Sequence, residues 1–193
     1  MARTDPLPPA ALQKIATQVG QRLSPTAAEH LEAGGTAQIG ENFLVFMLGL
    51  DAIRRPAGRL AERVRPTGHW HHQIHHGTQV REFARSSASA SVATPDVTEV
   101  TTSDAAARID DAIRWIDQNV HDDAVARMLV VPAYYLTCFW LSAGNTDRVV
   151  VADKPEQLTA LEYHRVYDGA DFLRRLAAIP NAQGIPTTPP PGR

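Results

Sequence analysis

One segment restricts the possible folds more than any other: residues 103–120 carry an amphipathic pattern with the period of an α-helix. Ser103 or Asp104 can cap its start. The apolar positions are spaced three and four residues apart, at Ile109, Ala112, Ile113, Ile116 and Val120. Such a stripe lies on one face of a helix and has to be buried against another layer. The segments on either side must therefore supply that layer.

The N-terminal third also shows helical spacing. We predict helices over 9–23 and 24–32, the second beginning with a serine N-cap followed by proline. Further helical segments are predicted over 39–50 and 53–64. The apolar run at 39–50 fits a buried strand as well, and helix is favoured because its large apolar residues share a helical face.

The period changes to two in the next segment, 69–86. Its alternation around His76-Gly77 predicts a β-hairpin. The register of that hairpin would place Trp70 opposite Phe83 as a cross-strand aromatic pair.

A second hairpin is predicted further along the chain. Residues 128–141 resemble a buried strand that is interrupted or bulged at Pro132. A turn at 144–145 then leads into a strand over 148–152. Asp168 caps a last helix.

These elements predict an α+β fold: N-terminal helices, then an antiparallel sheet built from two hairpins, with helices packed on one face. A single α+β domain should contain almost all of them. The expected boundaries are a disordered lead over 1–8, the domain over 9–180, and a Pro-rich tail over 181–193. The domain has a helical part at 9–65 and a sheet and helix part at 66–180. Residues 86–103 are expected to be a flexible connection that can include a short strand around 97–101.

Composition excludes several classes of protein. The formal net charge of −2 argues against nucleic acid as a partner, because phosphate neutralisation needs an excess of Lys and Arg. No apolar run approaches the roughly 20 residues that a membrane-spanning helix needs, and the N-terminus lacks a signal-peptide pattern. We therefore expect a soluble, cytoplasmic protein without a membrane partner. Its high Arg and Ala content suggests a bacterial source.

Five of the eight histidines lie between His69 and His76. On a strand, His69 and His71 point to the same side, and a His-x-His pair can hold one metal ion. In the predicted register Glu82 lies opposite His71, as a third ligand or a carboxylate that orients the imidazole. The sequence thus suggests a site for zinc or another divalent transition metal, although solvent-facing histidines on a hairpin need no ligand.

The same hairpin can instead present a surface to a ligand or partner. It interleaves aromatic, histidine and cationic side chains, namely Trp70, His72, Arg81, Phe83 and Arg85. Such a mixture can stack on aromatic groups, and a solvated strand face with one aromatic anchor explains it equally well.

Cys138 is the only cysteine, so no disulfide can form within the chain. His164 and Asp168 could complete a catalytic set with it. However, its apolar surroundings are typical of a buried thiol, and no nucleophile motif surrounds it.

Two functions of different classes follow. The first is a non-catalytic binding or assembly module that acts through protein–protein contact. Its partner would be another protein or a second copy of the chain. The sequence does not require a cofactor for this function. The alternative is a zinc-type, metal-dependent hydrolase that uses the histidine cluster to activate water. Whether the chain is an enzyme stays open at this point.

Overall fold

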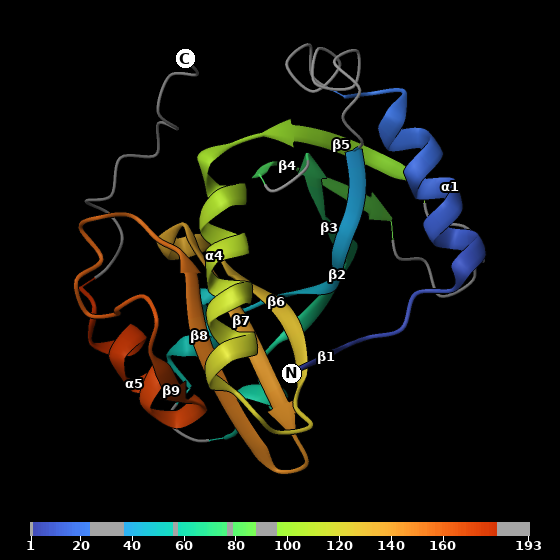
Figure 1. Cartoon of the computed structure of the whole chain (residues 1–193). Helices are drawn as coiled ribbons and strands as arrows, with labels where there is room; N and C mark the ends of the chain where they lie inside the picture. Colours follow the sequence, from blue (N-terminus) through green and yellow to red (C-terminus); the bar gives the residue numbers. More distant parts are fainter. Residues whose placement is uncertain (1, 24–36, 56–57, 77–78, 88–95, 181–193) are drawn as a thin grey trace.

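The computed structural model describes residues 2–23, 37–55, 58–76, 79–87 and 96–180. Over these ranges the chain has a mixed α+β fold, as the sequence predicts (Figure 1). The strands are β1 Arg3–Thr4, β2 Ala37–Met47, β3 Arg65–His76, β4 Gln79–Ser87, β5 Val97–Thr102, β6 Val125–Val131, β7 Leu136–Ala143, β8 Thr146–Asp153 and β9 Val166–Asp168. The helices are α1 Pro9–Gly20, α3 Leu50–Ile53, α4 Asp104–Asn119 and α5 Gly169–Ala178, with 3-10 turns at η1 Leu60–Glu62 and η2 Pro132–Tyr134.

The described strands form one mostly antiparallel sheet of nine strands. Its order is β5-β4-β3-β2-β6-β7-β8-β9, and β1 pairs with β6 beside that path. The two middle strands, β2 and β6, run parallel and are paired only over Val45–Met47 of β2. Beyond this short contact, the N-terminal half of β2 departs from β6, and the short β1 takes its place along β6. The sheet is therefore split on one side of its centre.

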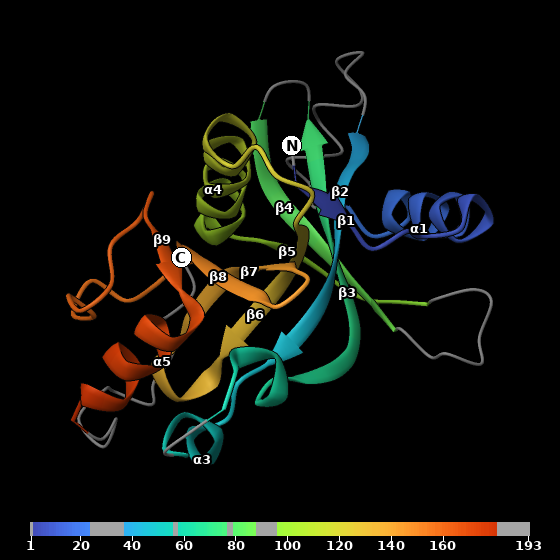
Figure 2. The ribbon, with the colours of Figure 1, turned by 90° about the horizontal axis from the view of Figure 1, so that it is seen from below.

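Helices cover both faces of the sheet, which corrects the expectation of helices on one face (Figures 1 and 2). Apolar residues of α4 pack on one face, against Phe43 of β2 and Phe139 of β7. On the opposite face, α3 and α5 pack against β6, β7 and β8. Residues of α1, among them Ile15, pack with Ile74 and Ala84 of β3 and β4. Two covering layers explain why so many strand residues are buried on both sides.

The helix predicted over 103–120 is confirmed as α4. Ser103 caps its start, because the Ser103 side chain accepts a hydrogen bond from the Ala105 amide. Asp168 likewise caps α5 by accepting from the Ala170 amide. Both caps were readable from sequence because each is a local interaction within a few residues.

The helix predicted over 39–50 is wrong, since most of this region is strand β2. Phe43 and Val45 are buried on the α4 side of the sheet, while Phe46 packs into the cluster beneath α3 and α5. A strand covered on both faces is a continuous apolar run, whose periodicity does not separate strand from helix. In the region expected to be helical over 53–64, the described residues form only the end of α3 and the turn η1.

The predicted register between β3 and β4 is also wrong. Trp70 lies opposite Ser86, and Phe83 lies opposite Gln73. The pairing is shifted by three residues along β4 from the predicted register: His76 lies opposite Gln79, which shifts the pairing by two, and a bulge between Ile74 and His75 adds one more residue to β4. Neither the position of the turn nor a bulge can be read from alternation alone. Likewise, residues 128–141 form two paired strands, β6 and β7, joined by η2 at Pro132 rather than one bulged strand.

Part of the lead over 1–8, which was expected to be disordered, forms β1. The connection over 86–103 contains the end of β4 and strand β5, which confirms the short strand expected around 97–101. The predicted helix over 24–32 and the tail over 181–193 lie outside the described residues. Within the part of the chain that is described, no helix combines the length and apolarity needed to cross a membrane.

Candidate ligand-binding cavity

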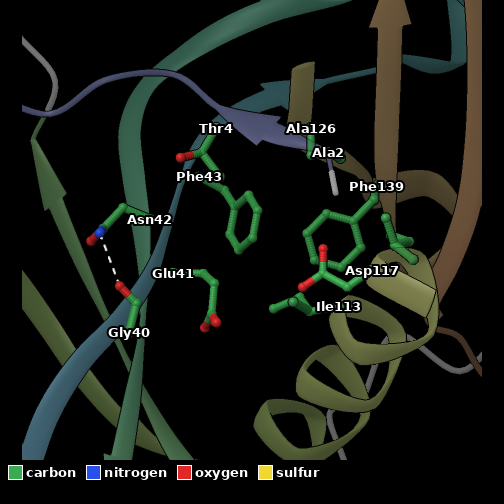
Figure 3. Close-up of a pocket in the computed structure, with 11 residues that line it drawn as sticks. Ala2, Thr4, Gly40, Glu41, Asn42, Phe43, Ile113, Asp117, Ala126 and Phe139 are labelled. Atoms are coloured by element: carbon green, nitrogen blue, oxygen red, sulfur yellow. Dashed lines mark hydrogen bonds between the residues drawn. The ribbon is translucent and has the colours of Figure 1, made fainter. Parts of the chain in front are cut away.

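A cavity of about 370 Å³ opens where the sheet splits (Figure 3). Its walls come from β1, β2, α4, β6 and β7, so segments far apart in sequence meet there. The lining residues are Ala2, Thr4, Gly40, Glu41, Asn42, Phe43, Ile113, Ile116, Asp117, Ala126 and Phe139. This volume lies within the range of small-molecule sites in proteins.

The inner part of the cavity is apolar. Phe43 and Phe139 face each other across the split, with ring centroids 4.8 Å apart and planes inclined by 60°. Ile113 and Ile116 of α4 and Ala126 of β6 complete this lining. Both rings are almost fully buried in the core that α4 covers.

Two carboxylates, Glu41 from β2 and Asp117 from α4, point into the same space (Figure 3). Among the described residues of the lining they are the only charged side chains, and none of these residues is Lys, Arg or His. Partial burial raises the pKa of Asp117, the positive charge of the chain's own α-amino group lowers it, and the charge of Glu41 raises it. The two groups therefore repel each other electrostatically.

Glu41 is positioned by a neighbouring histidine. His75 Nε2 lies 3.1 Å from Glu41 Oε2, and both side chains are partly exposed. The His75 ring lies directly over Gly40, where a Cβ would be only 2.2 Å from Nε2. The absence of a side chain at Gly40 is what allows this ring to reach Glu41.

The N-terminal segment forms one wall of the cavity through Ala2 and Thr4. Arg3 and Thr4 pair in parallel with Val125 and Ala126 of β6. Just beyond the strand, Asp5 accepts two hydrogen bonds from Arg127 of β6, at 2.9 and 3.0 Å. The wall is therefore held by backbone pairing and a bidentate ion pair.

The proposed metal ligands do not converge as the sequence suggested. His69 is exposed, while His71 is buried, stacks on Phe83 at 4.8 Å and lies opposite Arg85 rather than Glu82. Glu82 is buried opposite Ile74. Its carboxylate oxygens lie 2.9 Å from His76 Nε2 and 2.9 Å from the Thr102 hydroxyl. Among the described residues, no group of three or more His, Cys, Asp or Glu side chains is arranged to hold a metal ion.

The buried His72 has a defined hydrogen-bonding role. Asn42 donates through Nδ2 to the Gly40 carbonyl, which turns its Oδ1 toward His72 Nδ1 at 2.6 Å. His72 Nδ1 therefore donates, and its Nε2 accepts from the Ser86 hydroxyl at 2.7 Å. Burial lowers the pKa of His72 to about 4 and that of His71 to about 3. Both imidazoles are neutral structural groups at neutral pH.

The predicted partner surface is mostly internal. Trp70, His72 and Phe83 are buried, whereas Arg85 is exposed, lies over the Phe83 ring and pairs with Glu99 at 3.1 Å. The side chain of Arg81 lies outside the described part of the structure. The aromatic and cationic residues of this segment therefore do not form one accessible face.

Cys138 is fully buried, and burial raises the pKa of its thiol. His164, its candidate partner, lies on the surface, where its Nε2 is 2.7 Å from Asp111 and its ring stacks on Trp115. Asp168 is used as the α5 cap. The catalytic set considered from sequence is thus not assembled.

Sequence reasoning missed Glu41 and Asp117 as a pair. Glu41 lies in the segment predicted as a helix over 39–50, and Asp117 lies outside the apolar stripe of α4 from which that helix is predicted. The apolar neighbours of Glu41 in β2 were a signal of partial burial, but only the tertiary structure shows that Glu41 lies near Asp117 of α4.

Comparison with models of protein families, with curated proteins and with solved structures gave no match to this chain.

Proposed function

We propose that this chain is a non-catalytic binding module whose ligand occupies the cavity between the two halves of the sheet. The observation that carries the proposal is the split itself. Pairing between β2 and β6 begins only at Val45, and the space beside the preceding residues of β2 is a cavity walled by five elements. Apolar walls with a few polar groups are typical of ligand sites.

The alternative, a metal-dependent hydrolase based on the histidine cluster, has weaker support. That alternative requires Glu82 to lie opposite His71. In the structure, Glu82 instead lies opposite Ile74, and His71 lies opposite Arg85. An imidazole buried as deeply as His71 also leaves no open coordination position for a substrate or water.

Contact with a protein partner or a second copy of the chain remains a second proposal. In its favour, large apolar side chains are exposed at Met47, Tyr135, Tyr163 and Val166. Size-exclusion chromatography with light scattering tests self-association. A strictly monomeric protein that captures no partner would leave this second proposal without support.

Methyl NMR with a charge-balanced fragment library tests the cavity proposal. The library should contain equal numbers of cationic, neutral and anionic compounds. We expect some compounds to shift the methyl signals of Ala126, Ile113 and Ile116 without shifting those of the α5 core. Ala2→Leu, which adds bulk at the cavity wall, should weaken these compounds, while Ala107→Leu on the exposed side of α4 should not. A library without any cavity binder would refute the proposal.

A further inference from the structure

We propose that the ligand of this cavity is a compact organic cation, a protonated amine carried on an apolar group, with its ammonium between Glu41 and Asp117. This inference rests on the proposed function and specifies the chemistry of the same site.

The charged side chains among the described lining residues are both negative, although the positive charge of the chain's α-amino group also acts on Asp117. Glu41 and Asp117 enter from opposite walls, and none of the described lining residues has a cationic side chain. Two carboxylates brought together in a partly buried space repel each other, and a cation between them converts this repulsion into attraction. An anionic ligand would add to the repulsion.

The two carboxylates also retain capacity to accept hydrogen bonds. Among the described residues, Glu41 is bonded only through Oε2, to His75, and Asp117 has no hydrogen-bond partner. Asn42 is already committed, because its amide bonds to Gly40 and His72. Thr4 adds a hydroxyl to the lining. An ammonium group carries three N–H donors, which suits these acceptors.

The rest of the cavity favours an organic body over a bare metal ion. Phe43 and Phe139 present aromatic rings next to the carboxylates, and aromatic faces attract organic cations. Ile113, Ile116 and Ala126 provide further apolar contact. Among the described residues, no third His, Cys, Asp or Glu joins the two carboxylates, so a divalent metal would have to take most of its ligands from water.

The fragment library described above separates the two proposals. Cavity binders that are mainly cationic support both. Cavity binders without a preference for cations overturn the inference and leave the binding function standing. If no compound enters the cavity, the binding function fails and the inference fails with it.

A matched set of probes gives the sharper test. We would titrate the folded full chain at pH 7.5 and low salt with 2-phenylethylammonium, the neutral 2-phenylethanol and the anionic 3-phenylpropanoate. We expect the ammonium compound to bind at least about tenfold more tightly than the alcohol, and the carboxylate to bind most weakly. Equal affinity of the ammonium compound and the alcohol would overturn the inference.

Variants of the two carboxylates test where the ammonium group binds. Glu41→Gln and Asp117→Asn keep the shape of each side chain, so each should weaken the ammonium compound severalfold and leave the alcohol unchanged. Glu156→Gln and Asp51→Asn remove exposed carboxylates outside the lining and serve as matched controls. Because Asp117 makes no contact with His75 in the structure, its variant is independent of any disturbance to the His75–Glu41 pair. Ammonium binding that both cavity variants leave unchanged would contradict the assigned position.

Discussion

Arg127 on β6 holds Asp5 of the N-terminal segment through two parallel hydrogen bonds, from Nε at 2.9 Å and from Nη2 at 3.0 Å. Arg127 itself is fixed by the Phe46 and Trp140 rings, which its guanidinium covers at 5.5 and 5.3 Å. This pair therefore attaches the wall formed by Ala2 and Thr4 to the rigid centre of the sheet.

Replacing Asp5 should loosen that wall. Asp5→Asn removes the charge and one of the two acceptors, so we expect amide exchange at Arg3, which donates to the Ala124 carbonyl, to accelerate roughly tenfold. The global free energy of unfolding should fall by no more than about 1 kcal/mol. Hydrogen exchange followed by NMR measures the first quantity and chemical denaturation the second.

A control lies on the same segment. Asp123 also pairs with the segment, through Arg3 at 2.9 Å, but both side chains are highly exposed. Asp123→Asn should therefore change exchange at Arg3 little. Similar exchange in both variants would show that the Arg127–Asp5 pair does not hold the wall.

Gly40 should be sensitive to even a methyl group. A Cβ at this position would lie 2.2 Å from His75 Nε2 and 2.4 Å from its Cδ2, so Gly40→Ala must displace the ring and break its contact with Glu41. We expect large changes in the NMR signals of the His75 ring and the Glu41 carboxyl, with a stability loss of about 1 kcal/mol or less. Gly49→Ala is the control, because a Cβ there meets nothing within 4 Å. Unchanged His75 and Glu41 signals would contradict the geometry.

The buried, neutral His72 should make the free energy of unfolding decrease in acid. The pKa of His72 falls from 6.5 to about 4 on folding, so between these values the unfolded chain binds a proton that the folded chain does not. The stability that His72 provides is complete above pH 6.5 and is lost as pH falls toward 4, by about 1.4 kcal/mol per pH unit. His71, with a folded pKa of about 3, adds a similar loss over a wider range.

Denaturation at several pH values between 7.5 and 4.5 measures this effect. His72→Gln should be less stable than the parent at pH 7.5, since it disturbs the contacts to Asn42 and Ser86. However, its stability should depend less steeply on pH. His121→Gln, at an exposed position, should keep the slope of the parent. A His72 variant with the parental slope would disprove the role assigned to this imidazole.

Cys138 should be unreactive while the protein is folded. Its thiol is fully buried and its pKa is raised, so the reactive thiolate forms only after the surrounding strands open. We expect alkylation at pH 8 to be at least about a hundredfold slower in the native protein than in denaturant. Mass spectrometry of timed samples measures the rate. Rapid modification of the native protein would reopen the question of a functional thiol.

The sequence by itself determined the parts of the fold that depend on local interactions. The regular apolar spacing of α4 and the caps at Ser103 and Asp168 each involve residues within one or two turns, so their signal is contained in a short window. Turn residues such as Gly144, with φ of 55°, are readable for the same reason.

Only the tertiary structure decided the rest. Whether 39–50 was helix or strand depended on both faces of that segment being covered, by α4 on one side and by the α3 and α5 cluster on the other. The partners of His71 and Glu82 depended on where the pairing of β3 with β4 starts and on a bulge, which together shift the predicted register by three residues. The cavity depended on where β2 leaves β6, which brings Glu41 and Asp117 together across 76 positions of sequence. Each of these outcomes results from packing between residues that are distant in sequence. A local pattern of residue types does not encode that packing.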